Sequence, residues 1–302
     1  MKKLNVLGIG ELLWDIFNDS RKPGGAPANV AFHLNQLGMN GIIASRIGED
    51  SLGEEIQKFL MEMGISVSFL QHDSNHPTGT VTVELDQSGT PAFRIHENAA
   101  WDFLEMTSEL QELLPSLSAV CFGTLAQREN VSRRTIQTLL ELLPRECLKV
   151  YDVNLRQNFF SRELLEILLS KSDIAKMNHE EVEILKPLLG IPLNASLTEC
   201  AEILCDRFRL KKVCVTRAEN GCLIVTHSGE IADVPGKNIQ VADTVGSGDS
   251  FTAALIYAEL KNCGLQIQAE FANAVGTLVA SYPGGMPPLR DELTQLKTQF
   301  GI

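Results

Sequence analysis

The stretch DTVGSGDSF, residues 243–251, joins a small-residue turn to an apolar helical pattern. Apolar residues then recur on one face, at Phe251, Ala254, Leu255 and Ala258. This spacing predicts a helix over 248–261. Gly246, Ser247 and Gly248 would leave backbone N–H groups uncovered at its start, where the helix dipole is positive. The segment therefore predicts an anion site.

Asp249 falls in the first turn of this predicted helix, beside the anion site. A site for a phosphate alone gains nothing from a neighbouring carboxylate. The carboxylate makes sense if it takes a proton from a hydroxyl group that attacks phosphorus. The alternative is a glycine-containing loop in which Asp249 is simply a helix-start residue favoured by the dipole. The spacing leaves both interpretations open.

Short apolar runs alternate with helical patterns along the chain, which is typical of repeated βα units and a mainly parallel sheet. Strands are predicted at 3–9, 41–46, 118–123, 147–153, 173–177 and 211–216. Helices are predicted at 27–37, 51–63, 129–143, 161–170, 179–189, 196–208, 248–261 and 266–281. We therefore expect one α/β domain spanning residues 1–302.

Two segments interrupt the alternation. Residues 11–17 have no helical period, and residues 79–96 alternate apolar and polar side chains around a turn at 86–90, which predicts a hairpin. Inserted strands of this kind predict a small β lid formed by about 11–24 and 69–98, too small to fold alone.

Polar residues follow the first strand and open the first helix. Asp15 lies near the carboxyl end of the first strand, where ligands of open α/β sheets bind, and suits a grip on two sugar hydroxyls. Gly24 and Gly25 allow close backbone approach, and Asn29 would project a polar amide from the first helical turn. The alternatives are a solvated loop aspartate and an ordinary helix entry.

Two further segments carry polar groups after strands. Asp152, Asn154 and Arg156 alternate, and the planar guanidinium suits phosphate or hydroxyl groups; the alternative is a structural turn with a surface arginine. Asn178 and Glu181 open a helix three residues apart. They suit a hydrated Mg²⁺ near phosphates, or else an ordinary capping box.

Composition narrows the function classes. The chain has 302 residues, 44% of them apolar, and a net charge of −12, which argues against a nucleic-acid binder. Its seven cysteines include no CxxC pair, which favours reduced thiols in a cytoplasmic protein. No apolar run approaches the length of a membrane span, and Asn5, Gly8 and Gly10 break the N-terminal run.

Together these segments resemble the ribokinase-like (PfkB) carbohydrate kinases over essentially the whole chain. GGAPANVAFHLNQLG, residues 24–38, resembles the N-terminal sugar-binding signature of that family, and DTVGSGD resembles its C-terminal signature. The GGAPAN motif, the D-x-N-x-R motif and the tail PGGMPPL, residues 283–289, are most similar to the fructokinase branch. The resemblance implies a three-layer α/β/α domain with a mainly parallel sheet and a β lid.

The resemblance also implies residue roles. Asp249 would be the catalytic base, with Gly246, Ser247 and Gly248 as the anion hole. The sugar would be held by Asp15, Gly25, Asn29 and Arg156, and Arg156 could also contact the transferred phosphoryl group. Nucleotide contacts would come from Asn178, Thr216, Gly221 and Asn273, with Gly246 and Gly248. Glu181 would organise Mg²⁺ through water, and Asp243 lies where many relatives have a K⁺ loop.

Two positions depart from the family pattern. Ala218 replaces the middle glycine of the T-x-G-x-x-G nucleotide motif. Glu97 stands where relatives often carry an arginine after the second lid strand. The second departure leaves the substrate open.

The predicted function is ATP-dependent phosphorylation of a sugar hydroxyl, with Mg²⁺ as cofactor, K⁺ activation as an option and fructose as the leading substrate. Ribose, 2-keto-3-deoxygluconate, tagatose phosphate and nucleosides are alternative substrates. A non-catalytic sugar or nucleotide sensor and an NAD-dependent dehydrogenase are alternative classes, although GxGxxG is incomplete because Leu13 takes its third glycine position. The lid could also pair two subunits in a homodimer.

Overall fold

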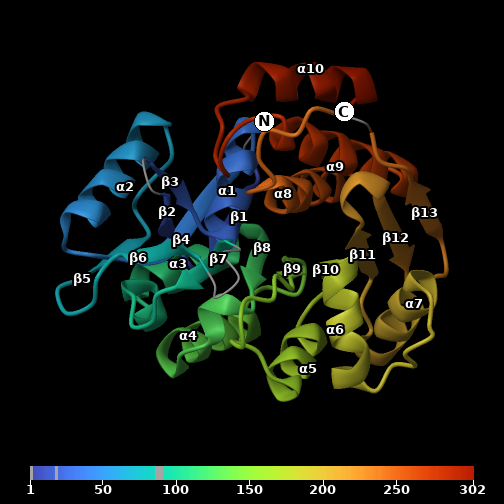
Figure 1. The fold of residues 1–302 in the computed structure, drawn as a ribbon, viewed down its shortest axis with the longest axis horizontal. Helices are drawn as coiled ribbons and strands as arrows, with labels where there is room; N and C mark the ends of the chain where they lie inside the picture. Colours follow the sequence, from blue (N-terminus) through green and yellow to red (C-terminus); the bar gives the residue numbers. More distant parts are fainter. Residues whose placement is uncertain (1–2, 18–19, 86–90, 238) are drawn as a thin grey trace.

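A nine-stranded, mainly parallel sheet forms the centre of the molecule (Figure 1). The computed structural model describes residues 3–17, 20–85, 91–237 and 239–302. The strands, in spatial order, are β13 (Ile231–Val234), β12 (Cys222–Thr226), β11 (Lys212–Thr216), β10 (Ile174–Asn178), β9 (Leu148–Asp152), β8 (Leu117–Gly123), β1 (Asn5–Ile9), β4 (Asn40–Gly48) and β5 (Leu70–Asp73). Only the pairings of β12 with β11 and β13 are antiparallel.

A second, four-stranded sheet confirms that strands are inserted into the βα series. Its strands, in spatial order, are β3 (Ser20–Gly24), β2 (Leu13–Phe17), β6 (Gly79–Leu85) and β7 (Pro91–Ile95). β6 and β7 are antiparallel, with Val81 opposite Ile95, which confirms the predicted hairpin. The predicted turn at 86–90 lies outside the described residues.

Helices cover both faces of the large sheet, which confirms the three-layer α/β/α fold (Figure 1). On one face lie α3 (Ser108–Leu113), α4 (Asn130–Leu142), α5 (Arg162–Ser170), α6 (His179–Leu189) and α7 (Leu197–Phe208). On the other lie α1 (Ala26–Gln36), α8 (Ser247–Leu260), α9 (Leu265–Ala280) and α10 (Arg290–Phe300). Helix α2 (Ser51–Glu62) packs on β4 and on the small sheet.

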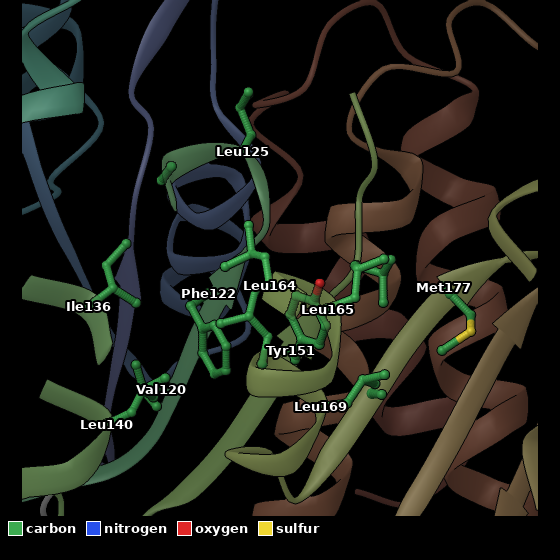
Figure 2. Packing of buried hydrophobic residues seen from close by; sticks show 14 of the residues in the cluster. Val120, Phe122, Leu125, Ile136, Leu140, Tyr151, Leu164, Leu165, Leu169 and Met177 are labelled. Atoms are coloured by element: carbon green, nitrogen blue, oxygen red, sulfur yellow. The ribbon is translucent and has the colours of Figure 1, made fainter. Parts of the chain in front are cut away.

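Successive side chains of the central strands point to opposite faces of the sheet, so each strand contributes to both apolar layers. In β8, Val120 and Phe122 belong to the cluster under α4 and α5, whereas Ala119 and Cys121 belong to the cluster under α8. Figure 2 shows the first layer, where Phe122 and Tyr151 lie among leucines of α5. A strand buried on both faces reads as a continuous apolar run, which is why the sequence predicted these strands well.

Several elements differ from the sequence-based expectation. β5 was expected in the lid because it falls within 69–98, yet it pairs with β4 at the edge of the large sheet. The sequence analysis missed β12, β13, α3 and α10, and the eight predicted helices are present within about two residues at each end, as is usual for helix boundaries. The division into one domain with an inserted lid stays a prediction.

Helix α8 is buried almost all round, although the sequence suggested one apolar face. Every residue from Ser250 to Ala258 is buried, because α8 lies between the sheet, α1 and α9. A helix enclosed in this way is held rigidly, so its first turn is a fixed platform. Within the described residues, no helix combines the length and apolarity needed to cross a membrane.

Candidate active site

The start of α1 and the start of α8 meet directly. The Asn29 side-chain amide donates a hydrogen bond of 2.7 Å to Oδ2 of Asp249, across 220 residues of chain. Asn29 is only 3% exposed, and its neighbour Gly285 leaves no room for a side chain because a Cβ there would lie 2.8 Å from the amide nitrogen. The two segments singled out in the sequence therefore form one site.

The glycine pair before α1 brings the lid close to this site. Gly25 has φ +114°, and a Cβ on it would lie 2.3 Å from the backbone oxygen of Glu11. A Cβ on Gly24 would lie 2.7 Å from Oδ2 of Asp15. Gly25 requires glycine because its φ is positive and the contact is with backbone, whereas a side chain at Gly24 would displace the Asp15 carboxylate. Together the two glycines let the chain pass from the small sheet to α1 around Asp15.

The start of α8 carries uncovered amides, although fewer than expected. Gly246 is the N-cap in the left-handed conformation, with φ +76°, and no side chain caps the helix. The amide of Ser247 donates to the Thr244 carbonyl at 3.3 Å, and its hydroxyl donates to the Gly276 carbonyl at 3.0 Å. No acceptor within the described residues contacts the amides of Gly246 and Gly248. Ser247 therefore fixes the turn, and among residues 246–248 the uncovered amides are those of the two glycines.

We expect Gly246→Ala to disrupt this turn. An alanine Cβ would lie 2.5 Å from Cα of Gly285, and the positive φ adds about 1–2 kcal/mol of strain. Denaturant unfolding should show a loss larger than that strain alone, and turnover should fall. Gly229→Ala is the matched control, because Gly229 also has positive φ but has no atom within 4 Å of the added Cβ. Equal destabilisation in both variants would contradict the close contact.

Three carboxyl groups gather around the meeting point. Burial raises the pKa of Asp249 to about 6, that of Asp15 to about 6 and that of Glu11 to about 7. The negative charge of Asp249 raises the pKa of both other groups further. Glu11 is 2% exposed; its Oε1 accepts from the Ala26 amide, and its Oε2 has no partner within the described residues. Closely spaced carboxyl groups of this kind can hold several hydroxyl groups of a polyol.

Arg156 is near enough to this carboxyl cluster to affect it electrostatically. Its side chain is exposed and donates to the Leu155 carbonyl at 3.2 Å. Its positive charge nevertheless lowers the pKa of Glu11, Asp15 and Asp249, against the effect of their burial. The predicted contact of the guanidinium with a phosphate or hydroxyl group stays a prediction.

A buried ion pair beneath α8 was missed by the sequence analysis. Lys176 of β10 contacts Asp152 of β9 at 3.1 Å, and the Thr252 hydroxyl donates to Oδ2 of Asp152 at 2.8 Å. A single lysine in the otherwise apolar strand DIAKM, residues 173–177, was the available signal. Glu11, directly after GIG, was predicted only to break the N-terminal apolar run and not to belong to the site.

Asn178 and Glu181 form the capping box that the sequence left as an alternative. Asn178 Oδ1 accepts from the Glu181 amide at 2.8 Å, and Glu181 Oε2 accepts from the Asn178 amide at 2.7 Å. Glu181 Oε1 accepts from the Leu155 amide at 2.8 Å. The carboxylate thus couples the end of β10 to the loop after β9, and each of its oxygens already has one donor.

The residues present fit Mg²⁺ only in an outer, water-mediated way. Within the described ranges, no group of three or more His, Cys, Asp or Glu side chains could hold a metal ion. An ion that keeps its waters and binds substrate phosphates needs no such group, because one carboxylate can contact it through water. Glu181 retains lone pairs for that contact, whereas direct coordination would compete with its two backbone donors.

The predicted nucleotide-binding residues lie at one end of the large sheet, where the parallel strands β10 and β11 finish. Thr216 of β11 is paired with Asn178 of β10. Asn273 of α9 is 8% exposed and donates to the Pro235 carbonyl at 3.2 Å. Gly221 has φ +85°, and its Cβ would lie 2.0 Å from the Val234 oxygen, so this position requires glycine. Ala218 has φ +49°, a conformation that glycine would adopt without strain.

Asp243 fits K⁺ poorly. Its Oδ2 accepts from Lys22 of β3 at 3.1 Å and from the Gly284 amide at 2.9 Å, and its Oδ1 accepts from the Val245 amide. These backbone bonds and the Lys22 ammonium lower the pKa of Asp243, against its partial burial. An ammonium therefore already supplies a positive charge to this carboxylate. Glu97, the second position that departs from the family pattern, has an exposed side chain.

Comparisons with known proteins identify carbohydrate kinases as relatives of this chain. The profile of the pfkB family carbohydrate kinases matches residues 7–292. The sugar kinase PH1459 of Pyrococcus horikoshii is 28% identical over 312 residues, which is 97% of this chain and 95% of that protein. The structure of that uncharacterized kinase in complex with ATP has a TM-score of 0.80 and covers 97% of both chains.

Fructokinases are similar over comparable lengths. The fructokinase of Escherichia coli is 28% identical over 296 residues, 91% of this chain and 92% of that protein. The fructose-, ADP- and calcium-bound structure of Vibrio cholerae fructokinase is 25% identical, has a TM-score of 0.80 and covers 97% of this chain and 98% of that one.

The family profile, together with the three-layer fold, defines the chain as a carbohydrate kinase. Because the family profile spans nearly the whole chain, this protein belongs to the pfkB family of carbohydrate kinases. The family prediction is confirmed, and the dehydrogenase alternative is set aside.

Proposed function

We propose that this protein transfers the γ-phosphoryl group of ATP to a hydroxyl group of a hexose, with D-fructose as its substrate. The observation that carries the proposal is the 2.7 Å contact between Asn29 and Asp249 at the uncovered start of α8. In the proposed reaction the Asn29 amide would bind a hydroxyl group and Asp249 would be the base, beside the uncovered amides that would bind the anion.

The acceptor sugar would lie between the lid and α1. Asp15 and Asn29 would bind the hydroxyl groups of the sugar. Gly25 would let the backbone come close to these hydroxyl groups. Asp249 would accept the proton of the attacking hydroxyl as the new O–P bond forms. Positioning of this kind, with the proton acceptor already in place, accounts for most of the catalysis expected in phosphoryl transfer.

The nucleotide would approach over the edge formed by β10, β11 and α9. Asn178, Thr216, Gly221 and Asn273 would contact it, and the amides of Gly246 and Gly248 would stabilise charge on the equatorial phosphoryl oxygens. Arg156 would contact the sugar or the transferred group. Bound Mg²⁺ would neutralise phosphate charge, with Glu181 contacting its waters.

Fructose is favoured over other acceptors by the relatives. The fructokinases of Escherichia coli and Vibrio cholerae cover more than nine-tenths of this chain, and the latter was solved with fructose. Ribose, 2-keto-3-deoxygluconate, tagatose phosphate and nucleosides are the competing substrates, because the lid position of Glu97 departs from the family pattern.

An ADP-release screen over these acceptors tests the proposal. We expect MgATP-dependent turnover, with the highest kcat/KM for fructose, and equal rates with and without added K⁺ because Lys22 already pairs with Asp243. Higher kcat/KM for another acceptor would replace fructose. Sugar binding without ADP formation would instead support the sensor alternative.

Location and assembly stay predictions. We propose a cytoplasmic enzyme whose lid could pair with that of a second copy to form a homodimer. Gel filtration at several protein concentrations would test the assembly, and a monomer throughout would contradict it.

A further inference from the structure

Lys176 lies beneath the first turn of α8, with its side chain only 8% exposed. Its ammonium contacts both carboxylate oxygens of Asp152, at 3.1 and 3.2 Å, and the Asp152 side chain is 3% exposed. Replacing such a buried ion pair by apolar residues often leaves stability unchanged or improves it. The pair is therefore better explained by a role in the site than by stability.

The pair is built against α8 at two successive turns. The Thr252 hydroxyl donates to Oδ2 of Asp152 at 2.8 Å. One turn earlier, a Cβ on Gly248 would lie 2.9 Å from Nζ of Lys176. Glycine at this position thus lets the ammonium approach the helix start, directly next to Asp249.

The ion pair of Lys176 and Asp152 acts on the pKa of Asp249. Burial and the negative charge of Asp152 raise the pKa of Asp249, whereas Lys176 and the Asn29 hydrogen bond lower it. Arg156 also lowers it. Glu11, Asp15 and the buried thiol of Cys121 are further titratable groups whose pKa is raised by Asp249, and Glu181 also acts on Lys176. Without Lys176, Asp152 and Asp249 would be two neighbouring carboxylates that tend to share a proton.

We propose that Lys176 is a positioning residue of the kinase site: its ammonium neutralises Asp152 beneath α8 and so keeps Asp249 ionised as the proton acceptor. This inference rests on the proposed function, in which Asp249 accepts the proton of the sugar hydroxyl. It assigns Lys176 no contact with either substrate.

The test is the pH dependence of kcat/KM in Lys176→Met. The ascending limb should move toward alkaline pH by about one unit, which lowers kcat/KM about tenfold at any pH below the limb. Lys176→Arg keeps the positive charge and should restore much of the loss. An unmoved limb in an active, folded Lys176→Met variant would overturn the proposal.

Lys212→Met is the matched control. Lys212 also lies between the sheet and α8, but it pairs with Glu259 at the opposite end of that helix and contacts Gln268 at 2.7 Å. Its loss should lower stability without moving the limb. A shift as large as that of Lys176→Met would show a general effect of loosening α8, which also contradicts the proposal.

Asp152→Asn gives a result of opposite sign and decides the question if Lys176→Met does not fold. Removing the Asp152 charge should move the limb toward acid pH, while the amide can still accept from Thr252. A limb that does not move, or moves toward alkaline pH, would overturn the role of the pair. Failure of the native enzyme to phosphorylate any sugar would instead contradict the proposed function.

Discussion

Replacing Asp249 by alanine should lower kcat by about 10²-fold or more and change the KM for sugar only modestly. The carboxylate is held in place by the Asn29 amide at the start of a helix whose middle, Ser250–Ala258, is entirely buried. Its loss removes the proton acceptor but leaves Asp15, Asn29 and the uncovered amides to bind the substrates. Steady-state kinetics with the best sugar measures both parameters.

The pH dependence of the activity gives a second test of the role of Asp249. Because burial raises the pKa of Asp249 to about 6, the native enzyme should gain activity as the pH rises through that region. Glu11 and Asp15 titrate nearby, so the limb belongs to the coupled cluster. Asp249→Asn keeps the shape of the side chain but cannot accept a proton, and it should be as slow as the alanine variant. Near-normal turnover in either variant would remove Asp249 from the role of base.

The second large effect is a loss of stability in acid caused by His33. This side chain is 0% exposed; its Nε2 donates to the Gly285 carbonyl at 2.9 Å, and its Nδ1 accepts from the Gln36 amide at 3.3 Å. Gln36 in turn donates to the Pro287 carbonyl and accepts from the Leu289 amide. The neutral imidazole therefore anchors the segment that carries Gly285 into the site.

Burial lowers the pKa of His33 from 6.5 to about 4 in the folded protein. In the unfolded chain His33 therefore becomes protonated below about pH 6.5, whereas in the folded protein it stays neutral down to about pH 4. Stability from this group is complete above pH 6.5 and falls by about 3 kcal/mol as the pH drops to 4. The raised pKa values of Glu11 and Asp15 act in the opposite direction, so the native curve alone does not isolate the effect.

His33→Asn separates the histidine from the carboxyl groups. Urea unfolding of both proteins between pH 4 and 7 gives the difference in the free energy of unfolding. The native protein should be more stable at pH 7, and its advantage should shrink by about 3 kcal/mol toward pH 4. An advantage that stays constant over this range would contradict the buried neutral histidine.

The fold could largely be predicted because its local signals agree. Central strands such as β8 are apolar on both faces, and helices such as α6 carry a capping box and a helical period. The misassigned strand β5, LQHD, is short and polar, and it becomes a strand only by pairing with β4. Its assignment to the lid failed because sequence position does not say which sheet edge a short strand joins.

The candidate site was predicted in part. DTVGSGD and GGAPAN pointed to Asp249 and Asn29, because turn glycines and a helix start leave a readable pattern. Ser247 was expected to offer a free amide, yet that group bonds to Thr244. Lys176 and Glu11 were missed because their importance lies in which carboxyl groups surround them, which no spacing along the chain encodes.

The sequence by itself determined the alternation of strands and helices, the positive-φ glycines before α1 and α8, and the residue types of the site. These depend on interactions within a few residues, where the backbone conformation follows from local chemistry. Only the tertiary structure decided that Asn29 meets Asp249, that Lys22 reaches Asp243 and that Lys176 neutralises Asp152 under α8. The physical reason is that burial and charge act through space, so the pKa of a carboxyl group depends on neighbours contributed by distant strands.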